Sequence, residues 1–336
     1  MDFEFLECIG HGGFGQVFKA VNQQSNEILA IKSVHLNNGD DVKPMEEGRL
    51  LKECNHENLI KFHGVYRLDQ ESGNLFIAME FCGGGSLYDL YKYLGPFCND
   101  EVAYVCREVL KGLKYLHGKS LIHRDIKGQN ILVNETGKVK IGDLGLAARV
   151  SDLSARFQRV GTYDWMAPEV SRVKFVGPYN EKCDIWSLGM MTMEIAEAQI
   201  PSIDLRRNGN WSRECHDFIR RLLVFNPSRR PSAEELLLHP FVNGSHLTQC
   251  QMNRRLKCQE LYKMLDKSLQ PGHEEVQEAG CKAEHVVKGT HGGRQQPGHV
   301  EEQGHGEGQE PGRGEGQEPG RGEGQEPGRA EGQEPG

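Results

Sequence analysis

Four polar residues follow one another closely near the middle of the chain. Asp125, Lys127 and Asn130 lie in the segment IHRDIKGQN, and Asp143 comes thirteen residues after Asn130. Phosphoryl transfer needs a carboxylate that accepts the proton of the attacking hydroxyl, a cation that balances charge, and hard oxygen ligands for Mg²⁺. We therefore predict that Asp125 is the base, that Lys127 balances charge on the transferred phosphate, and that Asn130 and Asp143 bind Mg²⁺.

A glycine-rich segment near the N-terminus could hold the phosphates of a nucleotide. It reads GHGGFGQV from Gly10 to Val17. A G-x-G-x-x-G pattern also opens dinucleotide-binding folds, but there a helix must follow the glycines. Here a strand is expected after them, so we predict a hairpin whose backbone can approach phosphates closely, with Phe14 at its tip.

A lysine in the next expected strand adds a charged partner for phosphates. Lys32 lies seventeen residues after Gly15, and Glu47 lies on the helix expected to follow. A lysine in a central strand is unusual unless it is paired, so Glu47 is the predicted partner. Without the other motifs, Lys32 would be interpreted as a surface lysine at the end of a strand. The prediction that it pairs with Glu47 therefore depends on those motifs.

The surrounding segments predict strands first and helices afterwards. Apolar, β-rich runs between turn residues indicate strands over 3–9, 16–20, 28–34 and 75–81. A helix is expected over 42–54, with Met45, Leu50 and Leu51 on its inward face. After the glycines at 83–85, apolar residues recur every three to four positions from Asn99 to about His117, which indicates a long helix. A β-rich part followed by a helical part predicts a ligand-binding cleft between them.

The net charge of the chain comes from its C-terminal end. The formal charge is -8, and residues 271–336 hold 14 acidic and 6 basic residues, which accounts for all of it. This region has no aromatic residue, and from Gly306 it repeats GEGQEPGR. Because so little apolar surface cannot offset the entropy of ordering, we predict a disordered acidic tail over 271–336. Its five histidines could indicate a metal site, but their irregular spacing favours a plain linker or tail.

Composition excludes several other classes of protein. Glu194 and Glu197 interrupt the apolar stretch 185–198, so no membrane span is expected, and the N-terminus lacks the basic region of a signal peptide. Ten cysteines are scattered without a C-x-x-C pair, which indicates reduced thiols and a cytoplasmic protein. The first 270 residues balance 34 basic against 34 acidic side chains, so no nucleic-acid partner is expected.

In their order along the chain, the motifs from Phe3 to Val242 resemble the eukaryotic protein kinases. They also include GTYDWMAPE from Gly161, DIW from Asp184 and NPSRRP from Asn226. The segments AMEFCGGGSLYDLY, AYVCREVLKGLKYLH and HRDIKGQNIL look like the germinal-centre-kinase branch of the sterile-twenty group, the mitogen-activated protein kinase kinase kinase kinases. Lys127, two places after the base, is similar to serine/threonine rather than tyrosine kinases.

The resemblance implies an α+β, two-lobed protein kinase fold over residues 1–242. A small β-rich N-lobe would cover about 1–82 and a larger α-helical C-lobe about 83–242, with a closing helix or linker over 243–270. It also implies that Glu169 pairs with a buried Arg230, and that Asp184 braces the backbone of the His123-Arg124 loop.

The resemblance further implies an ATP site. Met79 looks like the gatekeeper, Glu80 to Cys82 like the hinge that reads adenine through backbone hydrogen bonds, and Asp89 like a ribose contact. The expected catalytic residues are Asp125, Lys127, Lys32 and Glu47. The residues expected to contact ATP are Ile9, Gly10, His11, Gly12, Gly13, Phe14, Gly15, Gln16, Val17, Ala30, Lys32, Met79, Glu80, Cys82 and Asp89.

Four departures from the kinase pattern bear on activity. Leu144 stands where phenylalanine is usual, and the segment 162–165 reads TYDW where TPYW is usual. Gln158 occupies the usual phosphorylation position, which leaves Ser151 and Ser154 as displaced candidates. The C-lobe is also shortened near 205–211, where relatives have a longer insert.

We therefore expect an ATP-dependent serine/threonine protein kinase that uses Mg²⁺ and phosphorylates protein Ser/Thr hydroxyls. Its substrates would include downstream kinases of a mitogen-activated or stress signalling cascade. The alternative is a nucleotide-binding pseudokinase or dominant-negative scaffold, because of the shortened C-lobe and the missing phosphorylation site.

Overall fold

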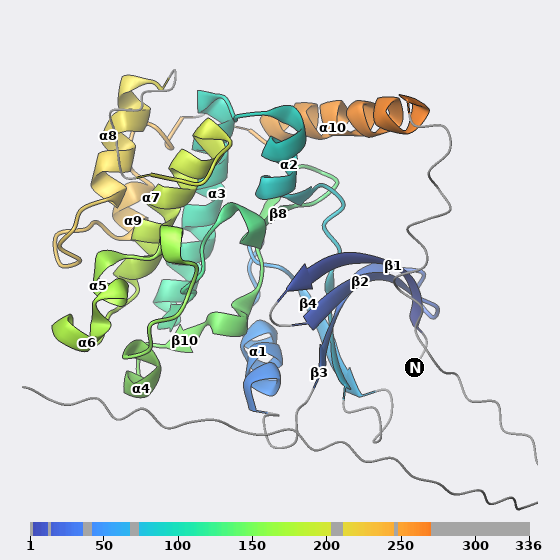
Figure 1. Ribbon diagram of the computed structural model, residues 1–336, viewed down its shortest axis with the longest axis horizontal. Helices are drawn as coiled ribbons and strands as arrows, with labels where there is room; N and C mark the ends of the chain where they lie inside the picture. The colour runs from blue at the N-terminus through green and yellow to red at the C-terminus, as the bar shows by residue number, and fades with distance from the viewer. Residues whose placement is uncertain are drawn as a thin grey trace, which may run out of the picture. The chain divides into compact units, whose positions relative to one another are not determined.

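A β-sheet lobe precedes a helical lobe along the chain, as Figure 1 shows for this computed structural model. The structure describes residues 3–12, 15–35, 42–67, 74–202, 211–244 and 248–269. The chain divides into two units, residues 1–282 and 283–336, and every described residue belongs to the first. The predicted α+β fold with a β-rich N-lobe and a helical C-lobe is confirmed. The predicted tail at 271–336 and the shortened segment, apart from Trp211, lie outside the described residues.

A five-stranded antiparallel sheet forms the N-lobe. Its strands pair in the order β1-β2-β3-β5-β4 and comprise β1 (Phe3–Gly12), β2 (Gly15–Asn22), β3 (Ile28–His35), β4 (Phe62–Arg67) and β5 (Asn74–Glu80). Leu29 and Ile31 pack with Ala20, Phe76 and Ala78 in a cluster of their own. Because side chains alternate along a strand, Ala30 and Lys32 point to the opposite face. The sequence did not predict β4, whose six residues are interrupted by Gly64 and are half-buried or exposed throughout.

Helix α1 (Val42–Glu53) follows β3 and confirms the predicted helix. Leu50 and Leu51 are 2% and 1% exposed, as expected for an inward face. The prediction for Met45 is wrong, since its side chain is 47% exposed. Residues three and four apart share a helix face, and the face that carries Leu50 and Leu51 continues to buried Glu47 rather than to Met45.

The C-lobe begins with a short strand and two helices. They are β6 (Gly85–Ser86), α2 (Leu87–Leu94) and α3 (Asn99–Gly118). Ser86 caps α2 reciprocally: its Oγ accepts a hydrogen bond from the Asp89 amide, and the Asp89 carboxylate accepts one from the Ser86 amide.

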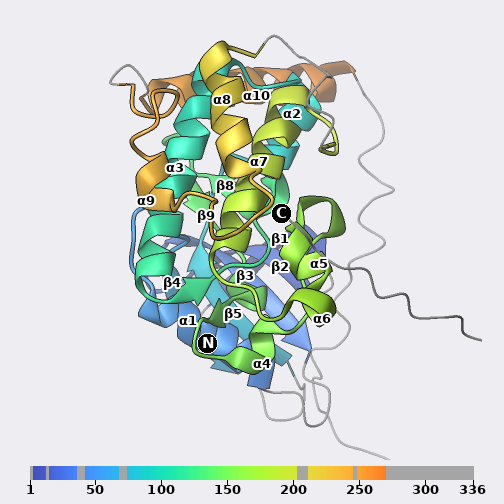
Figure 2. The ribbon, with the colours of Figure 1, turned by 90° about the vertical axis from the view of Figure 1, so that its left-hand side faces the viewer.

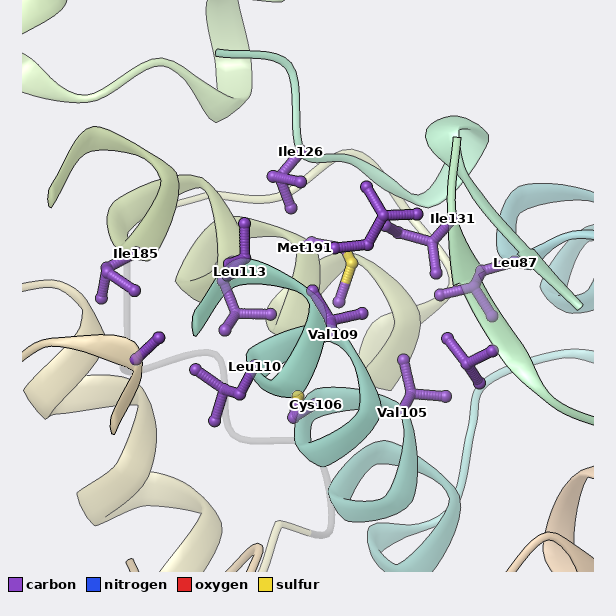
Figure 3. Packing of buried hydrophobic residues seen from close by; sticks show 14 of the residues in the cluster. Leu87, Val105, Cys106, Val109, Leu110, Leu113, Ile126, Ile131, Ile185 and Met191 are labelled. Carbon is purple, nitrogen blue, oxygen red and sulfur yellow. The ribbon is translucent and has the colours of Figure 1, made fainter. Parts of the chain in front are cut away.

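Helices α3 and α7 (Lys182–Glu197) form the centre of the C-lobe core. Figure 3 shows Val105, Val109 and Leu113 of α3 near Ile185 and Met191 of α7. In α7 every residue from Cys183 to Ile195 is buried, so this helix is surrounded by protein. It provides a rigid support for the loops around it.

Short strands and helical turns make up the segment between α3 and α7. The strands are β7 (Leu121–Ile122), β8 (Ile131–Val133), β9 (Val139–Ile141) and β10 (Ala148–Arg149), which form the small sheets β6-β8-β9 and β10-β7. The helical turns are η1 (Gly128–Asn130), η2 (Leu144–Leu146), α4 (Leu153–Arg156), η3 (Tyr163–Trp165), α5 (Pro168–Ser171) and α6 (Val173–Val176).

Three helices complete the described chain: α8 (Arg213–Leu222), α9 (Ala233–Leu236) and α10 (Cys250–Leu269). In Figure 2, α3, α7 and α8 lie side by side, and α7 contacts both of the others. The segment 243–270, expected to be a closing helix or linker, contains α10. Among the described residues, no helix is long and apolar enough to cross a membrane.

Candidate active site

The glycine-rich segment forms the turn between β1 and β2. Gly12 of β1 lies opposite Gly15 of β2 in the antiparallel pair, so a strand follows the glycines as predicted. Gly15 has a φ of 119°, and a Cβ at this position would lie 1.9 Å from the main-chain oxygen of Ser33. Only glycine fits such a position. Gly13 and Phe14 lie outside the described residues.

The flanking residues of this hairpin are in register and partly open. Gly10 lies opposite Val17, and His11 lies opposite Gln16. The apolar side chain of Ile9 is 44% exposed, as expected if it contacts the flat ring of a ligand. Ile9, His11 and Gln16 are thus exposed beside the glycine-rich turn.

Lys32 connects the N-lobe to the loop that follows β9. Its Nζ lies 2.8 Å from Glu47 Oε1 and 3.0 Å from Asp143 Oδ1. Burial alone would lower the pKa of Lys32, but the charges of Glu47 and Asp143 outweigh it, and the pKa is raised. The side chain is therefore a cation at neutral pH, held by two carboxylates.

Ala30 and Met79 lie beside Lys32 on the same face of the sheet. They are directly opposed residues of β3 and β5, and Lys32 is opposed to Ile77. Each of Ala30 and Met79 is 9% exposed. The small alanine and the longer methionine therefore shape the wall of the site next to the lysine.

Asp125 and Lys127 meet at Thr162. The Thr162 hydroxyl donates to Asp125 Oδ1 at 2.7 Å and accepts from Lys127 Nζ at 2.6 Å. Lys127 Nζ also lies 2.9 Å from Asp125 Oδ2. Burial alone would raise the pKa of Asp125, but these hydrogen bonds and the lysine charge outweigh it, so the pKa is lowered. Asp125 is therefore ionised at neutral pH and can accept a hydrogen bond from a hydroxyl.

Asn130 and Asp143 are brought together by the main chain. The Gly142 amide donates to the main-chain oxygen of Asn130 at 2.9 Å. The Asn130 side-chain nitrogen donates to both the main-chain oxygen and Oδ2 of Asp125, each at 2.8 Å, so the amide oxygen is the Asn130 side-chain atom that could bind a cation. The Asp143 side chain is 31% exposed.

This pair of oxygen donors fits Mg²⁺. Amide and carboxylate oxygens are hard ligands, and Mg²⁺ usually takes only one or two protein ligands beside phosphates and waters. The described part of the chain contains no cluster of three or more His, Cys, Asp or Glu side chains that could hold a metal. The donor set therefore suits an ion that is shared with a phosphate-bearing ligand.

The segment after β5 is fixed on the side of the C-lobe. Glu80 Oε2 accepts from Lys140 Nζ at 2.8 Å and from the Lys61 amide at 3.2 Å, so the Glu80 side chain is engaged with protein groups. Burial raises the pKa of the Cys82 thiol to about 12, and the thiol is neutral. The expectation that backbone groups of residues 80–82 read adenine stays a prediction.

Asp89 has a structural role that the sequence did not predict. Its Oδ2 accepts from the Ser86 amide at 3.0 Å and from Ser86 Oγ at 2.7 Å, so it belongs to the capping box of α2. The spacing S-x-x-D is itself a capping signal that can be recognised in the sequence. The ribose contact of Asp89 stays a prediction.

Buried polar contacts support the loop that carries Asp125. Asp184 Oδ2 accepts from the His123 amide at 2.9 Å, and Asp184 Oδ1 accepts from the Arg124 amide at 2.8 Å. Arg230 is 1% exposed, and its Nη1 lies 2.7 Å from Glu169 Oε1. These arrangements match the expectations for Asp184 and for the Glu169–Arg230 pair.

The residues that depart from the kinase pattern are accommodated without distortion of this site. Leu144 is 2% exposed and lies in the hydrophobic cluster that also contains Leu51. Tyr163 is 70% exposed, and Asp164 is exposed beside it. The changed residues at 163–164 therefore alter the protein surface rather than the contacts of Thr162 with Asp125.

Glu194 is a buried carboxylate near the site that the sequence motifs did not predict. It is 1% exposed and accepts from the Gly128 amide at 2.8 Å, from Trp165 Nε1 at 2.8 Å and from Tyr91 Oη at 3.1 Å. Burial raises its pKa, and these three donors lower it only in part. The signal was present in the sequence, since Glu194 is a charged residue inside an otherwise apolar stretch.

Comparisons with known proteins agree with this geometry. Residues 3–242 match the protein kinase domain family. The chain is 42% identical over 270 residues to mitogen-activated protein kinase kinase kinase kinase 3 of Homo sapiens, which covers 74% of this chain and 30% of the relative. It is 40% identical over 259 residues to serine/threonine-protein kinase dst1 of Dictyostelium discoideum, which covers 71% of this chain and 34% of the relative.

A plant protein shows the same degree of similarity. Serine/threonine-protein kinase 1 of Arabidopsis thaliana is 40% identical over 261 residues, which covers 71% of this chain and 30% of the relative. The chain thus spans about a third of the length of the curated relatives it matches. With the family match over residues 3–242 and these identities, the chain belongs to the protein kinase family.

Proposed function

We propose that the protein is an ATP-dependent serine/threonine protein kinase, which transfers the γ-phosphate of ATP to Ser and Thr hydroxyls of proteins. The observation that carries the proposal is the double contact of Lys32 with Glu47 and Asp143. It links the lysine that would hold phosphates to a carboxylate that would bind the metal ion, and both are needed for phosphoryl transfer in this family.

The chain's own residues would divide the work between binding and proton transfer. The backbone of the β1–β2 hairpin and Lys32 would hold the phosphates, while residues 80–82 would read adenine through main-chain groups. Asp125, ionised and fixed by Thr162, would orient the substrate hydroxyl and accept its proton. Lys127 lies beside Asp125 and would offset negative charge on the transferred group.

Family membership implies use of ATP and a divalent metal ion, and we propose that the ion is Mg²⁺ held by Asn130 and Asp143. When bound, the ion would neutralise charge on the phosphates. The free thiols among the described residues fit a reducing compartment, and we propose a cytoplasmic protein.

The class of substrate follows from similarity to a named relative. Because a relative is named mitogen-activated protein kinase kinase kinase kinase 3, we propose that the substrates include downstream kinases of such a cascade. No observation on the described residues favours the pseudokinase or scaffold alternative.

The test is transfer of ³²P from ATP to a generic basic protein. Wild type should label the substrate, and Asp125→Ala should lower the rate by about 10²–10⁴-fold through loss of the base. Lys32→Met should also abolish labelling, whereas Lys52→Met, an exposed lysine in the last turn of α1, should not change it.

Two outcomes would decide against the proposal. Equal labelling by wild type, Asp125→Ala and Lys32→Met would mean that the signal comes from another enzyme. Thermal stabilisation of wild type by Mg²⁺ and ATP without any labelling would instead support the scaffold alternative.

A further inference from the structure

Helix α10 lies beyond the residues that match the kinase family, yet it packs as part of the C-lobe. The family match ends at residue 242, and α10 spans Cys250–Leu269. Four residues spaced by three or four positions are buried: Met252, Arg255, Leu256 and Gln259 are 0%, 7%, 7% and 3% exposed. The helix contacts α2 and α3, and Figure 1 shows its start beside α2.

Arg255 anchors α10 to the loop between α2 and α3. Its Nη1 donates to Glu101 Oε2 at 2.8 Å, and its guanidinium lies 3.8 Å from the ring centre of Phe97. Nη2 donates to the main-chain oxygen of Gly95. A planar cation that is stacked and paired in this way fixes both the position and the rotation of the helix.

A second anchor holds the start of α10 against the loop between β8 and β9. The side chain of Gln249 donates to the main-chain oxygen of Thr136. A Cβ at Gly137 would lie 2.2 Å from Asn253 Oδ1, so α10 fits closely against this turn. The two anchors leave Leu256 little freedom to move away from its contact.

Leu256 closes over Gly84, in the glycine run between the hinge and α2. A Cβ at Gly84 would lie 2.7 Å from Leu256 Cδ2 and 2.7 Å from the main-chain oxygen of Val133. The Gly84 amide donates to that same oxygen at 2.9 Å. Gly84 therefore lies against both β8 and α10.

The residues on both sides of Gly84 are those expected to contact the nucleotide. The Gly85 amide donates to the main-chain oxygen of Cys82 at 3.0 Å, which joins the run to the hinge. The Ser86 amide donates to Asp89 Oδ2 at 3.0 Å, which joins it to the residue expected at the ribose. A shift of Gly84 would therefore pass through Gly85 to Cys82 and through Ser86 to Asp89.

We propose that Leu256 is a positioning residue for nucleotide binding, which acts by holding Gly84 so that Cys82 and Asp89 keep a fixed separation. Glycines lack side chains that could restrict their backbone, so only neighbours limit this run. Leu256 is such a neighbour, and it comes from outside the matched family region. The inference rests on the proposed ATP-dependent function.

The experiment compares Leu256→Ala with Leu261→Ala in the full chain. Both remove the same atoms from α10, but Leu261 is 60% exposed and serves as the matched control. Leu256→Ala should raise the Kd for ADP with Mg²⁺ and the KM for ATP about three- to tenfold, as expected for a residue that acts without ligand contact. The kcat at saturating ATP should stay unchanged, and Leu256→Met should restore the Kd.

Hydrogen exchange of the amides at 83–86 provides a second measurement that does not need activity. Leu256→Ala should speed exchange there, and Leu261→Ala should not. If Leu256→Ala lowers Tm but leaves Kd, KM for ATP and exchange equal to those of Leu261→Ala, Leu256 only packs and the inference is wrong. If Leu256→Ala does not fold, the smaller truncation Leu256→Val is judged by the same criteria.

Failure of the proposed function gives a different result. If wild type binds ADP but does not transfer phosphate, the comparison of Kd between Leu256→Ala and Leu261→Ala still tests the inference. If wild type does not bind ADP either, Leu256 has no nucleotide site to position, and the inference is overturned together with the proposed function.

Discussion

The guanidinium of Arg124 donates through Nη1 to the main-chain oxygen of Ala155 at 2.8 Å. The same nitrogen lies 3.3 Å from Tyr179 Oη, and Tyr179 Oη lies 3.0 Å from the main-chain oxygen of Gln158. Uncharged oxygens of the chain itself thus engage Arg124 beside Gln158, the usual phosphorylation position of the family. The Lys32–Glu47 pair is formed in the same structure.

We therefore expect phosphoryl transfer that does not depend on a phosphate in the segment 151–158. Phosphatase treatment and the double variant Ser151→Ala/Ser154→Ala should leave the ³²P transfer rate unchanged. Arg124→Ala should lower the free energy of unfolding by about 1.5–3 kcal/mol, because it removes charge-assisted hydrogen bonds. Loss of transfer after phosphatase, with recovery on rephosphorylation, would show that this expectation is mistaken.

Glu194 should position the catalytic loop through the Gly128 amide. In Glu194→Gln an amide group would face donors from Gly128, Trp165 and Tyr91, and one donor would lose its acceptor. We expect kcat to fall about tenfold, which corresponds to roughly 1.4 kcal/mol, while KM for ATP stays unchanged. Steady-state kinetics beside Glu197→Gln, on the same helix, would check this, and equal effects of the two variants would rule it out.

Ionised Asp184 should contribute to the free energy of unfolding, and this contribution should be lost at acid pH. Burial alone would raise its pKa, but hydrogen bonds from His117 and the Arg124 amide, with the charges of His117 and His123, hold the pKa below its usual 3.8. A carboxyl group whose pKa is lower in the folded than in the unfolded state stabilises the fold at pH values above the unfolded-state pKa. This stabilisation is lost as the pH falls through the folded-state pKa.

The variant Asp184→Asn should therefore be less stable than wild type at pH 7, by roughly 1–3 kcal/mol for the disturbed hydrogen bonds. The difference should shrink as pH falls below 3.8, the usual pKa, because Asp184 of the unfolded chain becomes protonated there before the folded carboxylate does. Urea unfolding from pH 3 to 7 measures both, with the exposed Asp164→Asn as control. A difference that stays constant over this range would contradict the expectation.

Removal of one partner from the buried ion pair Glu169–Arg230 should strongly lower the free energy of unfolding. Arg230→Ala would leave Glu169, whose exposed fraction is 9%, as a buried charge without its partner. We expect the free energy of unfolding to fall by about 3–5 kcal/mol. The neighbouring Arg229→Ala, at an exposed position, should cost little, and a similar loss in both variants would show that Arg230 has no special role.

Much of the fold and the candidate site could be predicted from residue types and spacing. The motifs that contain Lys32, Asp125 and Asp143 are local, and each needs only a few consecutive residues to be recognised. The strands of the N-lobe and helix α3 followed from apolar periodicity for the same reason. The inward face of α1 was predicted less well, since Met45 is exposed and Glu47 takes its place.

The contacts that hold these motifs in place could not be predicted in this way. Glu194 and Gly128 lie far apart along the chain, as do Leu256 and Gly84, and no local pattern relates them. The sequence by itself determined which chemical groups are present and which local elements carry them. Only the tertiary structure decided which groups meet, because packing of separate elements around the buried α7 and against α10 sets those distances.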